Sequence, residues 1–509
     1  MSFDDLLNIA LVGTSRQPPK LQAADGALGG AIAFAGSLAP EEQLLAAAAI
    51  FSNFELCGAL ADASEKLPEP SATDARPQCS ARAGQLLDQL LAMTNTPTKQ
   101  SLLELWLAGA DRTGKRVPHA SLPALFEYGT TSRDIRVMIS AVVDHRGQWL
   151  IAQNPRWSFT TAKEEDVERI WSTGNREQRV SAIRRYRATH PVEARKLIES
   201  TWKEDGADER AAFVEAMVVG IADADEPLLE AALDDRSKQV RAAAADVLAA
   251  LPNSAMVKRM IERVEPLLAF TPPAKGGLIK RAKPGQITVT LPADNFDPEL
   301  ARDGITEKPE DRLGRRQWWL LQMLRAVPPA HWTSKWGQPA GELVAASDGE
   351  FGDLLLRGWV EAAKKYRDTE WAEALAAAFV FNDRGALPVS LIGQLSAQMQ
   401  QEIAVHLFKS SKLNTQQILA VLESLSHELS PETVNVILES IRQDIKKAQN
   451  YSYMASAMIE RLSFKVPTAM HDQLATALTQ DEWSFNRKAV DTFLQVLLLR
   501  REIQREFAA

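Results

Sequence analysis

Residues 226–259 read EPLLEAALDDRSKQVRAAAADVLAALPNSAMVKR, and this stretch decides the predicted fold. Two apolar segments flank a polar turn at 234–237, which predicts a helix at 227–233 and a second helix at 238–250. Helical spacing places the apolar residues of the second segment on one face, namely Val240, Ala243, Ala244, Val247, Leu248 and Leu251. Paired helices with small residues at their contact are typical of HEAT-type α-solenoid repeats. Arrays of this kind usually bind other macromolecules and carry out no chemistry.

The sequence on either side of this stretch also predicts short helices. Helical patterns follow one another through short loops at 164–172, 176–189, 191–203, 208–221 and 253–265. Short loops make neighbouring helices antiparallel. Further helices are expected at 3–12 and 40–63, whereas 13–38 and 148–157 are expected to be irregular connections.

The helical pattern is interrupted between residues 267 and 310. Residues 286–291 read QITVTL, and this alternation predicts a short strand inside an insertion. We therefore predict an all-α protein, a HEAT-like α-solenoid with a small β-containing insertion. The expected divisions are an N-terminal helical domain (1–150), a HEAT-like repeat core (151–266), the insertion (267–310) and a C-terminal helical domain (311–509).

The overall composition indicates a folded protein of the reducing cytoplasm. The chain has 509 residues, 45% of them hydrophobic and 24% charged, which is ordinary for a folded protein. Its net charge of −8 argues against nucleic acid or an anionic membrane as the main partner. The two cysteines form no CxxC motif, and Asp4 and Asp5 stand where a signal peptide needs basic residues. No apolar run approaches the roughly 18 residues that a membrane span needs.

One sequence resembles a phosphate-binding loop. Residues 109–116 read GADRTGKR and fit GxxxxGK, but Arg116 replaces the serine or threonine that holds magnesium. The preceding LLELWLA is helical in pattern, whereas the motif follows a buried strand. We interpret this segment as a loop between two helices, and a nucleotide site is the alternative.

Residues for metal binding or catalysis are not arranged in recognisable patterns. No two of the seven histidines have the spacing of a helical metal-binding pair, and no GxSxG motif occurs. An acidic cluster is more readily explained by helix capping than by a bound cation; it comprises Asp223, Asp225, Glu226, Asp234 and Asp235. The sequence therefore predicts no catalytic residue, no metal ligand and no cofactor.

Two segments are candidates for binding a partner. The preferred one is 301–319, since arginine and tryptophan dominate interface energetics; its candidate residues are Arg312, Arg315, Arg316, Trp318 and Trp319. The adjacent tryptophans point about 100° apart on a helix, so one is expected to be exposed or packed on another layer. The alternative is that this segment seals the solenoid. The second candidate is the acidic turn Asp234–Asp235, and a cationic stretch at 275–283 is a weaker candidate for phosphate contacts.

Several phrases along the chain together resemble a known family. They are LLNIALVGTSRQPP, NPRWSF, GNREQRVSAIRRYRATHP, ARDGITEKP and GRRQWWLLQMLRAVPPAHW. In combination they resemble an uncharacterised bacterial family of about this length. Its members are often encoded beside a SWIM zinc-finger protein, a MoxR-type AAA+ ATPase and a von Willebrand factor A-domain protein. The resemblance covers most of the chain, least at 64–80 and 385–480, and it implies these partners but no active-site residue.

We therefore expect a non-enzymatic scaffold or adaptor that works with a MoxR-type ATPase and an A-domain protein. The alternative is a nucleic-acid-binding HEAT-like solenoid, including a DNA-repair enzyme that stacks a base on tryptophan. A nucleotide-binding enzyme built on 109–115 is the third hypothesis.

Overall fold

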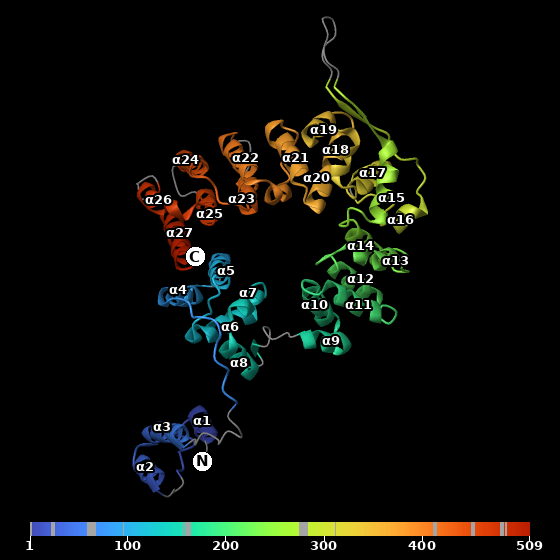
Figure 1. Cartoon of the computed structure of the whole chain (residues 1–509). Coiled ribbons are helices and arrows are strands. Elements are labelled where there is room, and N and C mark those ends of the chain that lie inside the picture. The colour runs from blue at the N-terminus through green and yellow to red at the C-terminus, as the bar shows by residue number, and fades with distance from the viewer. Residues whose placement is uncertain are drawn as a thin grey trace. The chain divides into compact units, whose positions relative to one another are not determined.

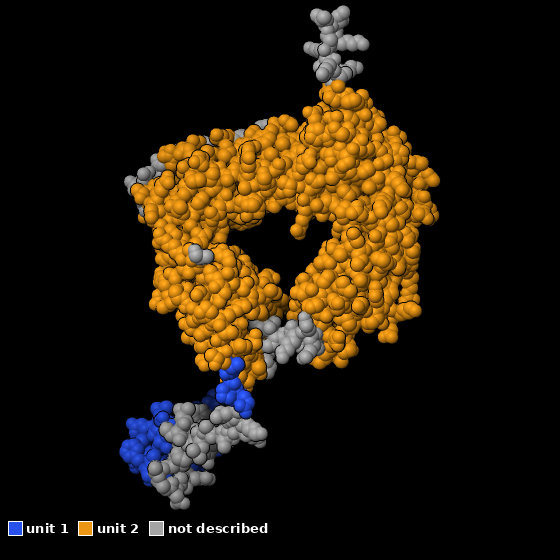
Figure 2. Space-filling model, viewed as in Figure 1, with its two compact units in different colours: residues 1–72 blue, residues 73–509 orange. Residues whose placement is uncertain are grey.

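The computed structural model describes the chain except residues 1–2, 22–25, 59–67, 95, 155, 158–163, 274–283, 311, 411–414, 449–452, 479–482, 484–485 and 509. The described residues are mainly helical, and their sheet has two short strands. The predicted all-α fold with a small β element is therefore confirmed. The chain divides into two compact units, residues 1–72 and 73–509 (Figure 2). The domain divisions expected at 150, 266 and 310 stay predictions.

Unit 1 consists of helices α1 (Phe3–Val12), α2 (Gly26–Gly36) and α3 (Pro40–Gly58). Helix α1 spans the predicted range and is followed by Gly13, whose φ of +92° suits glycine. The irregular connection predicted at 13–38 was wrong, because α2 lies within it. Ile32 and Ala35 of α2 are buried, and packing against α3 outweighs the low helix propensity of the glycines.

The first helices of unit 2 share one core. They are α4 (Ala81–Ala92), α5 (Pro97–Arg112), α6 (Leu122–Thr131), α7 (Arg136–Val142) and α8 (His145–Gln153), with a 3-10 turn at His119–Ser121. The irregular connection predicted at 148–157 was wrong over its first half, which belongs to α8. Asp144 caps this helix by accepting a hydrogen bond from the His145 N–H (2.8 Å), and Ile151 is buried in the core.

The stretch that decided the predicted fold forms α13 (Glu226–Ala232), α14 (Lys238–Leu248) and the start of α15 (Ala255–Val264). Between α8 and this stretch lie the helices α9 (Glu164–Thr173), α10 (Arg176–Arg187), α11 (Pro191–Thr201) and α12 (Ala207–Ala216). Two 3-10 turns, Asp223–Asp225 and Glu265–Leu267, lie in the same region. The predicted apolar face of α14 is buried, with every residue at most 7% exposed, and α14 packs against α12.

Arginines recur at the same position in three alternate helices. Arg179, Arg210 and Arg241 are each the fourth residue of their helix, in α10, α12 and α14, and they are evenly spaced along the chain. Arg179 Nη1 donates to Asp205 Oδ1 (2.8 Å), and Arg210 donates through Nε and Nη2 to Asp235 (2.9 and 3.0 Å). Each carboxylate lies just before the next helix of the stack. These pairs therefore join one layer to the next, a regularity that favours a repeated architecture.

The inserted segment contains strands β1 (Leu268–Thr271) and β2 (Gln286–Val289). They pair antiparallel, and the predicted strand at 286–291 is confirmed over β2. The insertion was expected to hold one hairpin, but the position of its first strand, β1, was not predicted, since four residues give too short an alternation before two prolines. Leu268 and Ile287 are buried against the helices. The cationic stretch at 275–283 lies wholly outside the described residues.

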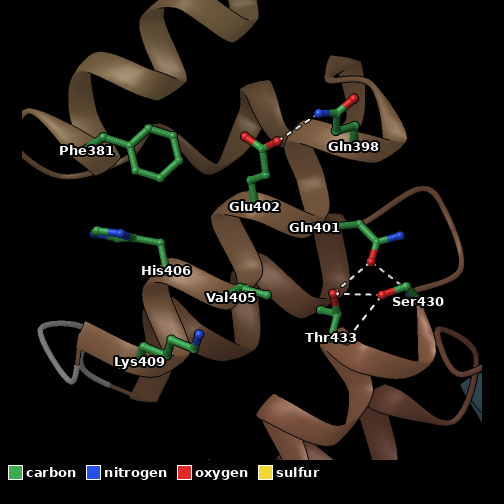
Figure 3. Close-up of a pocket in the computed structure, with 9 residues that line it drawn as sticks. All are labelled: Phe381, Gln398, Gln401, Glu402, Val405, His406, Lys409, Ser430 and Thr433. Carbon is green, nitrogen blue, oxygen red and sulfur yellow. Dashed lines mark hydrogen bonds between the residues drawn. The ribbon is translucent and has the colours of Figure 1, made fainter.

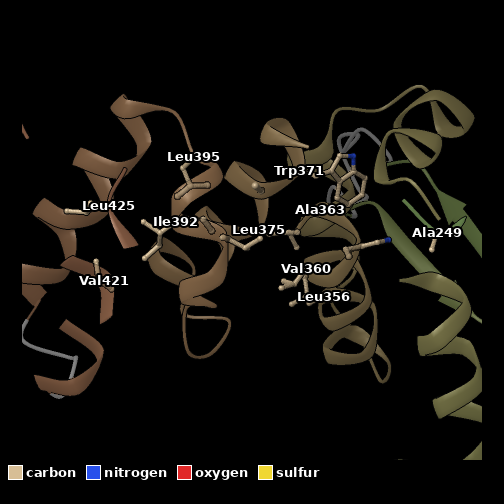
Figure 4. Close-up of a cluster of buried hydrophobic side chains, with 14 of the residues drawn as sticks. Ala249, Leu356, Val360, Ala363, Trp371, Leu375, Ile392, Leu395, Val421 and Leu425 are labelled. Carbon is tan, nitrogen blue, oxygen red and sulfur yellow. The ribbon is translucent and has the colours of Figure 1, made fainter. Parts of the chain in front are cut away.

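Helices continue to the C-terminus. They are α16 (Pro298–Arg302), α17 (Arg315–Leu324), α18 (Pro329–Trp336), α19 (Ala340–Ala346), α20 (Gly352–Tyr366), α21 (Thr369–Phe381), α22 (Ala397–Ser410), α23 (Thr415–Ser424), α24 (Pro431–Ala448), α25 (Tyr453–Leu462), α26 (His471–Ala477) and α27 (Arg487–Glu506), with 3-10 turns at Val389–Gln394 and Thr468–Met470. One continuous apolar core runs through successive layers, as Val360, Leu375, Ile392 and Val421 show (Figure 4). In the described ranges no helix has the length and apolarity to cross a membrane.

Helix α27 joins the two ends of unit 2 (Figure 1). Its residues contribute to two cores: Phe493 and Leu497 to that of the preceding helices, and Val496 and Ile503 to that of α4–α8. The next residue after the helix, Phe507, packs edge-on against Trp106 of α5, with ring centroids 5.2 Å apart. Unit 2 is therefore closed by apolar contacts between its first and last helices.

Candidate functional site

Trp318 and Trp319 of α17 are both buried, with exposures of 4% and 0%. Trp318 Nε1 donates to Thr306 Oγ1 (2.9 Å), and Trp319 Nε1 donates to the Glu307 carbonyl (2.9 Å). Trp319 also packs against Phe296, with ring centroids 5.3 Å apart. The two tryptophan side chains point in different directions, and the segment before α17 supplies a second layer that covers them. Both rings face the interior of this structure, and neither is presented to a partner.

The three arginines predicted beside these tryptophans have different environments. Arg316 is half-buried and donates to the backbone carbonyls at 291–292, which fixes the preceding segment onto α17. Arg315 is exposed, with Nη2 at 3.2 Å from Asp294 Oδ1. Arg312 is exposed as well. Only Arg312 and Arg315 therefore remain surface candidates from the preferred segment.

The acidic turn Asp234–Asp235 is bound within the chain. Arg302 donates through Nε and Nη2 to the two oxygens of Asp234 (2.7 and 2.9 Å), and these hydrogen bonds lower the pKa of that carboxyl. Burial acts to raise the pKa of Asp235, but its bonds to Arg210 and to the Ser237 N–H lower it below the ordinary value. Asp235 bonds the N–H of Ser237, the residue before α14, and pairing with arginines is the larger part of what the turn does.

Three arginines donate hydrogen bonds to the carboxylate of Asp303. Its carboxylate, 1% exposed, accepts from Arg259 Nη2 (2.7 Å), Arg263 Nη1 (2.5 Å) and Arg302 Nη1 (3.3 Å). Burial acts to raise the pKa of Asp303, but the hydrogen bonds from Arg259 and Arg263 outweigh it and lower the pKa below its ordinary value. The carboxylate is therefore held in its charged form at the junction of α15 and α16.

Asp303→Asn is expected to lower the free energy of unfolding by about 2 kcal/mol at pH 7, because charged hydrogen bonds are lost. A lowered folded-state pKa gives stability that is present above the ordinary value of 3.8 and lost as the pH falls through the folded-state pKa. The difference between variant and wild type should therefore shrink in acid, as measured by urea unfolding at several pH values. Glu299→Gln, at a 67% exposed partner of Arg263, is the control and should have little effect. A difference that does not change with pH would contradict the assignment.

The sequence that resembles a phosphate loop does not form one. Gly109 lies in the last turns of α5, so the loop interpretation was wrong for the first half of 109–116. A Cβ atom at Gly109 would lie 2.6 Å from the ring of Phe507, which explains the glycine by close packing. Gly114, with a φ of +65°, makes the turn that follows. The element before the turn is a helix, as predicted, where the nucleotide motif requires a strand.

One group of side chains has the spacing of metal ligands. Ligand atoms of Asp74, Asp144 and His145 lie within 4.8 Å of one another, as in no other group among the described residues. Asp74 accepts from the Arg146 N–H (2.9 Å) and lies 2.5 Å from His119 Nε2, while Asp144 caps α8. These oxygens therefore hold the segment at 73–78 on the start of α8, a structural role.

A groove of about 690 Å³ lies on the surface between α21, α22 and α24 (Figure 3). Residues of α21, α22 and the start of α24 line it: Phe381, Gln398, Gln401, Glu402, Val405, His406, Lys409, Ser430 and Thr433. Phe381 is 42% exposed, and its ring meets the ring of His406 edge-on, with centroids 5.0 Å apart. A large apolar side chain thus stands open to solvent beside a second ring.

Five of the polar residues that line this groove are hydrogen-bonded to one another. Gln401 Oε1 accepts from the Ser430 N–H (2.7 Å) and from Thr433 Oγ1 (2.8 Å), and Gln398 Nε2 donates to Glu402 Oε1 (2.9 Å). These bonded groups line the groove beside the aromatic pair (Figure 3). Apolar surface next to polar groups is the composition of a protein contact site. The groove offers contact area and recognition, and its geometry assembles no nucleophile with a base.

Sequence reasoning did not find this groove, although a signal was present. Positions 398, 402 and 406, and positions 401, 405 and 409, recur every four residues and share one face of α22. The contribution of Phe381 could not be read in this way, because it lies on the preceding helix. Only the packing of the two helices brings the two rings together.

The comparisons with known proteins bear on the family of the chain. Residues 5–507 match the model of DUF5691, a family of unknown function. No curated protein and no solved structure matches the chain. The expected membership of an uncharacterised family is confirmed, and the genomic neighbours stay a prediction. Because the match spans nearly the whole sequence, the chain belongs to DUF5691.

Proposed function

We propose that this protein is a non-enzymatic adaptor that binds other proteins and works with a MoxR-type AAA+ ATPase and a von Willebrand factor A-domain protein. The observation that carries the proposal is the groove beside Phe381, where α21 and α22 present an aromatic pair next to hydrogen-bonded polar side chains. The named partners come from the resemblance described above.

Two further observations support an adaptor. The helix layers from α9 onward share a continuous core, and arginine–aspartate pairs join the layers of α10, α12 and α14. Stacked helices offer extended surfaces on which large partners bind. The acidic side chains that a catalytic site could use at Asp225, Asp235 and Asp303 are instead engaged with arginines of the framework.

The test is a comparison of variants in the native host. Phe381→Ala should reduce the recovery of the ATPase and the A-domain protein with a tagged chain. Truncating a central aromatic of an interface costs about 2 kcal/mol or more, which corresponds to roughly a thirtyfold loss of affinity. Tyr453→Ala is the matched control, since Tyr453 is a 73% exposed aromatic on another helix.

Melting curves of the two variants should match that of wild type, because both side chains lie at the surface. Equal recovery of both partners with Phe381→Ala and with wild type would place the contact elsewhere. Recovery of neither partner with wild type would reject the named partners.

A further inference from the structure

A second groove, of about 1000 Å³, lies where α10 and α12 meet the turn between α6 and α7. Among its described lining residues, four arginines face a single acidic residue, Glu177; the arginines are Arg133, Arg176, Arg184 and Arg185. The chain as a whole is acidic, with a net charge of −8. The charge of this groove is therefore positive, whereas the net charge of the chain is negative.

The arginines of helix α10 fall into two classes. Arg179 and Arg187 point into the protein and are paired with Asp205 and Asp225. The four arginines of the groove are exposed, and no described residue forms an ion pair or a side-chain hydrogen bond with them. The inner arginines serve the framework. The four groove arginines form no ion pair within the described part of the chain. Their like charges repel one another, so an anion from outside the chain would be attracted.

The pKa of Arg136, which lies next to the groove, is affected by the positive charge of the groove arginines. Burial lowers the pKa of Arg136 in α7, and the charges of Arg133 and Arg185 lower it further. Its guanidinium is fixed by donating to the carbonyls of Gly129 (2.7 Å) and Thr130 (2.8 Å). The charges of Arg133, in the turn before α7, and of Arg185, in α10, therefore act at one place, where an anion would relieve the repulsion.

We propose that this arginine groove binds a carboxylate-rich segment of a partner protein. The planar guanidinium fork matches a carboxylate in two parallel hydrogen bonds, and arginine is enriched at protein interfaces. None of the described lining residues is aromatic, so the groove offers no platform on which nucleic-acid bases would stack. The acidic balance of the whole chain also opposes a long polyanion.

This inference goes beyond the proposed function, since it concerns a different groove and assigns the chemistry of the bound segment. The two grooves share no lining residue. It takes from the proposed function only that the anion belongs to a protein. A substitution in one groove can therefore abolish binding there and leave binding at the other groove unchanged.

The test is fluorescence anisotropy with a labelled oligoglutamate peptide and the full chain, at an ionic strength of about 0.15 M. We expect saturable binding that weakens as salt is added. Arg176→Glu combined with Arg184→Glu should weaken binding by at least roughly tenfold, because attraction becomes repulsion at the groove. The matched control combines Arg236→Glu with Arg505→Glu, which alters net charge equally at exposed arginines outside the groove. It should stay within about twofold of wild type if local rather than net charge decides binding.

Phe381→Ala should bind the peptide like wild type, which separates this test from that of the proposed function. Thermal melting checks that each double variant is folded, and Arg176→Gln with Arg184→Gln replaces the glutamate variant if it is not. Absence of saturable binding, or equal loss in the control, would overturn the proposal. Tighter binding of single- or double-stranded DNA of equal charge, lost in the same variant, would overturn it in favour of nucleic acid.

Discussion

Asp225→Ala is expected to lower the free energy of unfolding by about 3 to 5 kcal/mol, the cost of breaking a buried ion pair. Arg187 and Asp225 are 0% and 1% exposed, with Nη2 and Oδ2 at 2.7 Å. Asp225 also accepts from Arg195 Nη1 (2.9 Å) and from the Ala222 N–H (3.1 Å). Its loss leaves the guanidinium of Arg187 buried with only backbone carbonyls as acceptors.

Urea unfolding followed by circular dichroism measures this effect. Asp294→Ala is the control, because Asp294 is 71% exposed and its partner Arg315 is 50% exposed. Exposed pairs contribute about 1 kcal/mol or less. If the alanine variant does not fold, Asp225→Asn keeps the side-chain shape and should give a smaller loss. Near-equal stability of Asp225→Ala and Asp294→Ala would show that the pair is not buried as described.

Val247→Asp is expected to cost several kcal/mol, because it places an unpaired carboxylate in an apolar seam. Val247 is 4% exposed in α14, and its neighbours on the same face, Val240 and Ala244, are fully buried. Ala242→Asp introduces the same charge on the exposed face of this helix, where substitutions usually change stability by less than about 0.5 kcal/mol. Thermal melting distinguishes the two. An unchanged melting temperature for Val247→Asp would mean that the apolar face is assigned wrongly.

Local sequence patterns predicted the elements whose signals lie within a few residues. Pro191 starts α11 where the sequence predicted a restart, and α14 lies within one or two residues of its expected range. The strand at 286–289 was legible from its alternation. These features depend on backbone restriction and on side-chain periodicity, which a single segment contains.

Features that depend on distant segments were not predictable. The burial of both Trp318 and Trp319 requires a second layer from residues before α17. The closure of unit 2 requires that Phe507 meet Trp106 and Gly109. No local pattern indicates which helices become neighbours, because long-range packing decides that.

The two grooves illustrate the same limit. The arginine groove had a partial local signal, since Arg176 and Arg184 are two turns apart on one helix face. Its completion by Arg133 comes from a turn far earlier in the chain. Arg179 and Arg210 are regularly spaced in the sequence. Their partners Asp205 and Asp235 become recognisable only when the helices are stacked.

The central claim is that this chain binds proteins as an adaptor, and a titration of purified components tests it most directly. Sedimentation velocity of the chain mixed with the MoxR-type ATPase and the A-domain protein should show a saturable complex, with a dissociation constant of about 1 μM or tighter. Phe381→Ala should dissociate that complex, and Tyr453→Ala should leave it intact. Components that sediment separately at concentrations of about 10 μM, or a complex unaffected by Phe381→Ala, would contradict the account.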